Sequence, residues 1–143
     1  DRSSRTTIEL MNPYYTLVAD RAAHRCEYCH APEIVFNFPF EVEHIVPLYR
    51  GGNDEMSNLA LACRSCNLRK GTNTSGIDST YNTEVLLFHP RQNRWDEHFQ
   101  VQTESGAIAG MTPTGRVTVA SLGMNSQSQL IARQLWIRLG LFP

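Results

Sequence analysis

The order of apolar and polar positions divides the chain into short helices and strands. Asn12 and Pro13 have the chemistry of a helix start, and apolar side chains then recur at helical spacing as far as Ala22. This pattern predicts a first helix of about three turns that runs into Cys26.

Two strands and a second helix are expected next. Segment 34–40 is rich in β-branched and aromatic residues, and segment 42–46 has the same character. The residues 49–54 include two glycines and have the composition of a loop. Residues 64–70 can form a helix, which Gly71 would end.

The C-terminal half predicts a β-hairpin and a final helix. Strands are expected at 85–88 and around 98–101, with turns near Gly106 and Gly110. The last helix would begin at Ser126 and stop at Gly140. Its buried face is expected to consist of apolar residues, namely Leu130, Ile131, Leu135, Trp136 and Leu139.

Composition favours one compact globular domain. The chain has 143 residues, of which 41% are hydrophobic and 19% are charged. It has no apolar run long enough to cross a bilayer and no signal-peptide layout at its start, so we expect no membrane partner and a cytoplasmic location. The formal net charge is −1, which alone would not suggest nucleic-acid binding. A short basic cluster, Arg64, Arg69 and Lys70, nevertheless lies in a stretch, 59–77, that lacks acidic residues.

The cysteines have the spacing of a zinc site. All four fall into two Cys-x-x-Cys pairs, Cys26/Cys29 and Cys63/Cys66. Each pair can present two thiolates to one ion, and soft thiolates in tetrahedral geometry favour Zn²⁺. Two disulfides in a secreted protein are the alternative interpretation. A structural zinc ion would join two segments that are distant in sequence.

Between the cysteine pairs, the chain resembles the HNH endonuclease family. The resemblance rests on Glu43-His44 with Pro47, on Asn58-Leu59, and on Cys66-Asn67-x-x-Lys70. Within that family, it is similar to the subgroup whose ββα-metal motif is framed by two Cys-x-x-Cys knuckles. The segment from Leu87 to Phe99 also resembles a C-terminal segment of small bacterial members.

Phosphodiester hydrolysis needs a base for water, a cation and groups that orient the phosphate. An imidazole can accept a proton near neutral pH, so His44 is the candidate base. Glu43 and Asn67 offer the oxygen ligands that Mg²⁺ or Mn²⁺ prefers. The resemblance implies that Asn58 closes the loop of the motif and helps to orient the base, and that DNA is cut to leave a 3′-hydroxyl and a 5′-phosphate.

Two points concern the geometry of these residues. Glu43 and His44 are adjacent, so on a regular strand they would point to opposite faces, and a shared site requires a twist, a bulge or a phosphate that straddles the strand end. Lys70 lies on the same helical face as Asn67 and, with Arg69 and Arg64, is a candidate for phosphate contact. The alternative for these cations is an ordinary solvated surface.

We therefore expect an α+β fold, a ββα-metal core held by a four-cysteine zinc site, with flanking helices and a C-terminal β-hairpin and helix. The expected divisions are a tail (1–13), a nuclease core (14–76) and a C-terminal extension packed on the same domain (77–143). The expected function is metal-dependent DNA endonuclease. The alternatives are a non-catalytic zinc-ribbon module that binds nucleic acid or protein, and a nuclease module that acts only with a protein partner in a larger defence or mobile-element complex.

Overall fold

A computed structural model describes residues 12–143. Most of the expected tail, 1–13, therefore lies outside the described residues. The elements in chain order are α2 (Tyr15–Arg21), η1 (Glu33–Val35), β1 (Glu41–His44), η2 (Leu48–Arg50), η3 (Met56–Asn58), β2 (Leu59–Ala62), α3 (Arg64–Lys70), β3 (Ser75–Asp78), β4 (Thr83–Leu86), α4 (Trp95–His98), β5 (Phe99–Gln102), β6 (Ala107–Gly110), α5 (Pro113–Ser121) and α6 (Gln127–Arg138). The expected α+β class is confirmed. None of the described helices combines the length and apolar character needed to cross a membrane.

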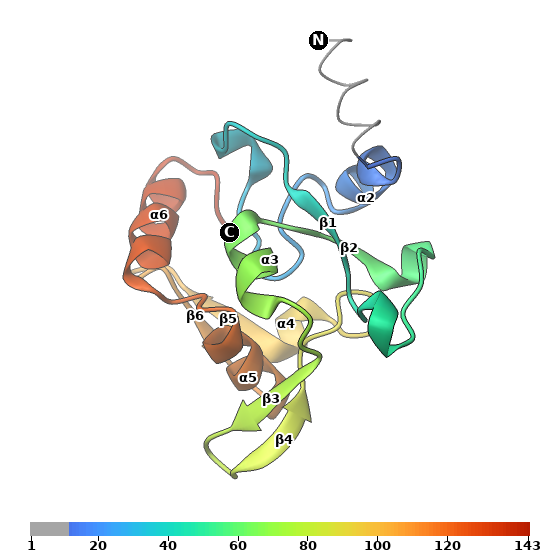
Figure 1. Cartoon of the computed structure of the whole chain (residues 1–143). Helices are drawn as coiled ribbons and strands as arrows, with labels where there is room; N and C mark the ends of the chain where they lie inside the picture. Colours follow the sequence, from blue (N-terminus) through green and yellow to red (C-terminus); the bar gives the residue numbers. More distant parts are fainter. Residues whose placement is uncertain (1–11) are drawn as a thin grey trace.

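The centre of the fold is a β-hairpin followed by a helix. Strands β1 and β2 pair antiparallel, with Glu41 opposite Ala62 and His44 opposite Leu59. Helix α3 follows β2 directly and packs on the hairpin (Figure 1). Its bounds agree with the sequence prediction, and Gly71 ends it. The succession β1, β2, α3 is the expected ββα unit.

The sequence prediction of a strand over 34–40 is wrong. This segment begins as the 3-10 helix η1 and then bends, and Ile34 is 82% exposed. Pro39 lacks the N–H that a strand ladder needs, so the apolar composition does not produce pairing here. The true partner of β1 is β2, whose residues are all buried and therefore show no alternation.

The first helix is shorter than predicted. The Asn12 side chain accepts a hydrogen bond from the Tyr14 backbone N–H at 2.9 Å, but α2 ends at Arg21. Ala23 and His24 both have positive φ angles, which no right-handed helix can accommodate. The chain therefore turns before it reaches Cys26.

The C-terminal half contains two more hairpins and two helices. Strands β3 and β4 pair with each other, as do β5 and β6. Helix α5, which the sequence pattern did not predict, packs on β6 and β3. Thr112 caps its N-terminus, because the Thr112 hydroxyl accepts from the Gly115 N–H at 3.0 Å. Figure 1 shows α5 beside the β3–β4 hairpin and α6 at the outer edge of the molecule.

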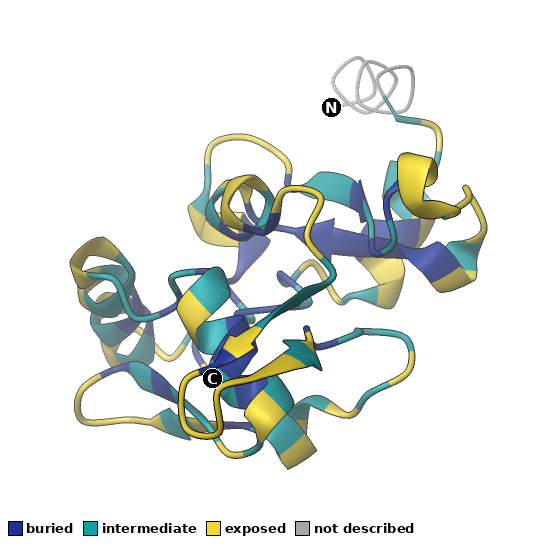
Figure 2. Cartoon of the chain, turned by 60° about the horizontal axis from the view of Figure 1, so that its bottom comes forward, coloured by how far each residue is buried: buried dark blue, intermediate teal, exposed yellow. Residues whose placement is uncertain are grey.

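The two halves of the chain share one buried core. Buried residues of β2 and of the cysteine segments belong to the same cluster as Phe88, Phe99 and Ile108 from the C-terminal half (Figure 2). The Trp95 indole donates to the Tyr28 backbone carbonyl at 2.8 Å, which fastens α4 to the first cysteine turn. We propose, as the sequence suggested, that 77–143 packs on the 14–76 core as one domain.

Helix α6 buries a different face from the one expected. Of the predicted apolar set, Trp136 is buried, whereas Ile131, Leu135 and Leu139 are 52%, 47% and 70% exposed. Arg133 is fully buried instead, and its guanidinium donates to two backbone carbonyls that belong to other segments. The helix orientation thus follows the hydrogen bonds of an arginine, which an apolar pattern does not report.

Candidate functional site

The four cysteines converge on one point inside the core. Their sulfur atoms all lie within 4.8 Å of one another, and all four residues are buried. The Cys29 and Cys63 sulfur atoms are 3.8 Å apart. A tetrahedral zinc site with Zn–S bonds of about 2.3 Å places its sulfur atoms about 3.8 Å apart, whereas a disulfide bond is about 2.0 Å long. The four thiols are free, so the cluster fits a structural zinc ion and not the disulfide alternative.

Two tight turns position these sulfur atoms. In the first turn, the His30 N–H bonds the Cys26 carbonyl at 2.9 Å, and His30 itself has a positive φ angle. In the second, Cys63 caps helix α3, and its sulfur accepts from the Cys66 N–H at 3.4 Å. Hydrogen bonds among the four thiols lower the pKa of Cys63 and raise the pKa values of Cys29 and Cys66.

A pocket of about 510 Å³ lies beside this centre, where strand β1 ends. It brings together three of the predicted residues, Glu43 and His44 from β1 and Asn67 from α3. The remaining lining residues come from β1 itself and from the segments that follow β1 and α3: Val42, Pro47, Leu48, Tyr49, Gly71 and Thr72. Because Asn67 follows Cys66 directly, one helix carries both a candidate zinc ligand and a lining residue of the pocket.

His44 is partly exposed and is held by a carboxylate. One third of its side chain is accessible, and its Nε2 atom lies 2.6 Å from Oδ1 of Asp54. The sequence interpretation missed Asp54. Asp54 lies in the loop that connects β1 to β2. The sequence feature that could have identified it is its position as an acidic residue in the glycine-containing loop after His44. With Nε2 donating to Asp54, the lone pair of a neutral imidazole is on Nδ1.

Asn58 fixes the loop between β1 and β2. Its amide oxygen accepts from the Val46 N–H at 2.9 Å, and its amide nitrogen donates to the Val46 and Asn53 carbonyls at 3.0 and 2.9 Å. Gly52 packs so closely that an added Cβ would lie 1.8 Å from the Val46 carbonyl oxygen. Asn58 does not line the pocket, and these bonds tie it to the backbone of the loop that follows His44.

Glu43 points to the other side of β1 from His44 and is buried among polar partners. Its carboxylate accepts a hydrogen bond from the Tyr28 hydroxyl and lies 3.2 Å from the Lys70 ammonium. Burial raises the pKa of Glu43, and the positive charge of Lys70 opposes this shift. The Glu43 and His44 side chains both line one pocket because this pocket lies across the end of the strand. This is the arrangement in which a site straddles the strand end.

Asn67 and Arg64 are linked to a second carboxylate of β1. The Asn67 amide nitrogen donates to Glu41, which leaves its amide oxygen without a bond to another described group. The Arg64 guanidinium is 3.8 Å from Glu41 and is mostly exposed. Glu41 therefore orients Asn67 from the face of β1 that α3 covers.

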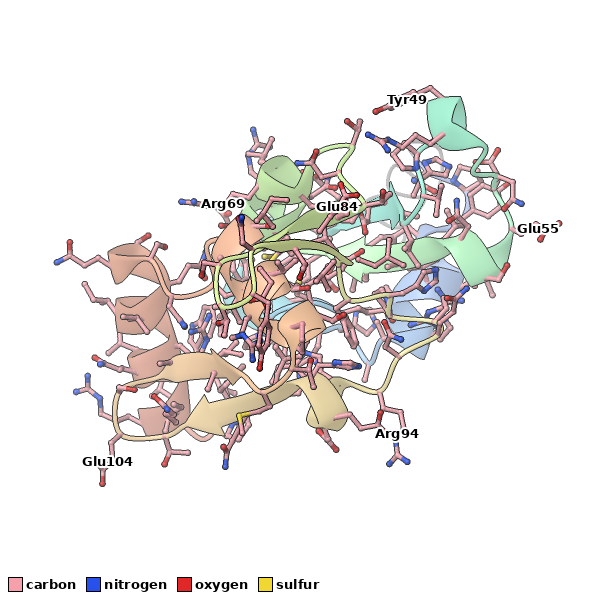
Figure 3. All side chains as sticks on the ribbon, turned by 90° about the horizontal axis from the view of Figure 1, so that it is seen from below. Tyr49, Glu55, Arg69, Glu84, Arg94 and Glu104 are labelled. Carbon is pink, nitrogen blue, oxygen red and sulfur yellow. The ribbon has the colours of Figure 1, made fainter. Side chains whose placement is uncertain are left out.

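The structure does not place the predicted phosphate-contacting residues as one cluster. Lys70 is 1% exposed, and its ammonium bonds the Ile45 carbonyl at 3.0 Å as well as Glu43, so it is not accessible to a phosphate. Arg69 is exposed but lies against Gly123, near the end of α5. Figure 3 shows Arg69 and Tyr49 well separated, so Arg69 does not border the pocket.

Comparison with known proteins agrees with this geometry. Residues 26–73, which run from the first zinc-ligand candidate to just beyond α3, match the family model for HNH endonucleases. This segment of the chain is therefore similar to the HNH endonuclease family. Searches of curated proteins and of solved structures found no match.

Proposed function

We propose that this protein is a metal-dependent endonuclease that hydrolyses DNA phosphodiester bonds with His44 as the general base. The observation that carries the proposal is the pocket that joins Glu43, His44 and Asn67 at the end of β1. An HNH domain supports nuclease activity in general. The choice of DNA, of the catalytic residues and of the ion rests on the residues themselves.

The arrangement of His44 supports proton transfer. Asp54 accepts from Nε2 and so keeps the lone pair on Nδ1, where it can take a proton from a water molecule that attacks phosphorus. When the proton arrives on Nδ1, the imidazolium is stabilised by the Asp54 carboxylate. Asn58 bonds the Val46 and Asn53 carbonyls and so holds the loop that carries Asp54 in position beside β1.

The donor atoms of the pocket suit a hard divalent ion. A carboxylate has about four lone-pair sites, and the bonds from Tyr28 and Lys70 occupy only part of those on Glu43. The amide oxygen of Asn67 adds a second oxygen ligand. When bound, Mg²⁺ or Mn²⁺ supplies a Lewis acid that stabilises charge on the phosphate and the leaving group.

Plasmid cleavage tests the proposal. Zinc-loaded protein is incubated with supercoiled plasmid and Mg²⁺ or Mn²⁺, beside a chelator control and the variant His44→Ala. His24→Ala is the matched control, because His24 also bonds carboxylates but lies outside the pocket. Nicked or linear plasmid is expected with wild type and His24→Ala only. Intact plasmid from folded wild-type protein would favour the binding module or the partner-dependent nuclease, and cleavage by His44→Ala would refute the assignment of the base.

A further inference from the structure

The segment η2 is an apolar projection at the edge of the pocket. Leu48 and Tyr49 are 57% and 69% exposed, and both line the same pocket as His44. In Figure 3, Tyr49 lies at the outer boundary of the molecule. Large apolar side chains in water beside a candidate active site are typical of a binding surface.

The projection is closed by hydrogen bonds of its own backbone. Three backbone hydrogen bonds of 3.0 to 3.1 Å close it, from Arg50 and Gly52 to the Pro47 carbonyl and from Gly51 to the Leu48 carbonyl. Pro47, at its base, is buried. The apolar side chains are therefore presented on a preformed surface, so that a ligand does not have to order the loop on binding.

The chemistry of the projection suits nucleobases. The Arg50 guanidinium lies 5.5 Å from the centre of the Tyr49 ring, and its Nε atom donates to the Tyr49 hydroxyl at 3.0 Å. The hydroxyl lies 3.4 Å from that of Thr72, which follows α3. An aromatic ring and an adjacent guanidinium form the type of surface on which unpaired bases stack.

The charge of the chain also favours contact with bases over contact with phosphates alone. The formal net charge is −1, so the chain as a whole offers little attraction to a polyanion. Lys70 is buried, and Arg64 is close to Glu41, which reduces the positive charge available near the pocket. Stacking can contribute the affinity that these groups do not.

We propose that Tyr49 stacks on an unpaired base next to the scissile phosphate, with Leu48 and Arg50 at its side, so that the protein prefers DNA with unpaired bases to continuous duplex. The inference rests on the proposed function, because it places the scissile phosphate beside His44. It names a substrate class, unpaired or distorted DNA. The bases of a continuous duplex are already stacked on each other and cannot cover the Tyr49 ring without being separated.

Binding measured by fluorescence anisotropy tests the inference. The probes are a labelled duplex and a duplex of the same length with a central bubble of mismatched bases, so that the number of phosphates is equal. His44→Ala serves as the background in every protein to prevent cleavage. The variants are Tyr49→Ala, Tyr49→Trp and Tyr81→Ala. Tyr81 is the matched control, since it is also 69% exposed and has an arginine, Arg116, 5.9 Å from its ring centre, but does not line the pocket.

We expect the background protein to prefer the bubble, and Tyr49→Ala to weaken bubble binding by about 5- to 150-fold with little effect on duplex binding. Tyr49→Trp should retain the preference, and Tyr81→Ala should match the background. Equal bubble affinities for Tyr49→Ala and Tyr81→Ala, or no binding of either probe, would overturn the inference. If binding shows a Tyr49-dependent preference for the bubble but the wild-type protein never cuts DNA, the nuclease proposal is refuted and this inference stands. If the wild-type protein cuts DNA but shows no such preference, this inference is refuted and the nuclease proposal stands.

Discussion

His44 and Asp54 are in polar contact, with Nε2 and Oδ1 2.6 Å apart, and their pairing leads to a prediction about rate. Asp54→Ala should leave the imidazole free to rotate and to change tautomer. We expect this variant to reduce the cleavage rate by about tenfold or more. The reduction should be smaller than that caused by the loss of the base itself, which is about 10²- to 10⁴-fold. Asp54→Asn retains an oxygen that can accept from Nε2, so it should stay closer to wild type. Single-turnover cleavage of a labelled oligonucleotide measures both variants. Equal rates for Asp54→Ala and wild type would contradict the pairing.

Glu43 and Lys70 form a buried ion pair, in which each group depends on the other. Lys70→Met should leave the Glu43 carboxylate buried without its cation, at a cost of about 3–5 kcal/mol in the free energy of unfolding. Adding Glu43→Gln to Lys70→Met should recover much of this loss, because no uncompensated charge then remains. Urea unfolding of the zinc-loaded proteins measures these values.

Arg69→Met is the control for the Lys70 substitution, since Arg69 is the adjacent cation but is exposed. We expect its free energy of unfolding to stay close to that of wild type. Equal stabilities for Lys70→Met and Arg69→Met would show that the buried pair does not stabilise the fold.

At the scale of elements, local signals predicted α3 well and the strands poorly. The Cys63 cap and Gly71 mark the two ends of α3 in the sequence itself. Strand β2 carries no alternation because both of its faces are buried. Segment 34–40 has the composition of a strand, yet no strand within residues 12–143 pairs with it. Strand pairing depends on a partner distant in sequence, which composition does not identify.

The candidate site was predictable where chemistry is tied to spacing. The four cysteines and the group Glu43, His44 and Asn67 are brought together as their spacing suggested. Asp54 and the burial of Lys70 could not be predicted, because both depend on the path of the loop and on the packing of α3 against β1. The same limit applies to Arg133, whose partners are the backbone carbonyls of Gly106 and Met124, both outside its own helix.

Asp78 joins the β3–β4 hairpin to α5 and leads to a prediction about pH. The Arg116 guanidinium donates to both oxygens of Asp78 at 3.2 and 3.0 Å and lowers the pKa of this carboxyl. A lowered folded-state pKa means that the unfolded chain binds the proton more readily. The resulting stability is present above the unfolded pKa of about 3.9 and is lost as the pH falls through the lower, folded value.

Asp78→Asn should therefore destabilise the protein near neutral pH, and the difference from wild type should shrink as the pH falls below about 4. Urea unfolding of both proteins over this range measures the difference. Protonation of the cysteine thiolates also lowers stability at acidic pH, but it affects both proteins equally, so it does not contribute to the difference between them at any one pH. A difference that does not change with pH would contradict the assigned linkage.

At the scale of the whole molecule, the four-cysteine cluster, a candidate zinc site, connects the segment after α2 to the start of α3. Structural zinc contributes about 10–16 kcal/mol to the folding of small zinc-finger peptides, more than the total stability of most domains. We expect one zinc ion per chain and loss of the fold when it is removed by a strong chelator or by Cys63→Ser. Zinc release, followed with a chromogenic chelator, should coincide with the loss of near-UV circular dichroism. A metal-free chain with an unchanged melting temperature would refute the structural role.

The rate of DNA cleavage by His44→Ala tests the central claim most directly. Zinc-loaded wild type, His44→Ala and His24→Ala are compared in single-turnover cleavage of labelled DNA with Mn²⁺ or Mg²⁺, after equal melting temperatures establish that all three are folded. The pocket of Glu43, His44 and Asn67 predicts a loss of about 10²- to 10⁴-fold for His44→Ala and no loss for His24→Ala. Equal cleavage rates for His44→Ala and wild type would contradict it.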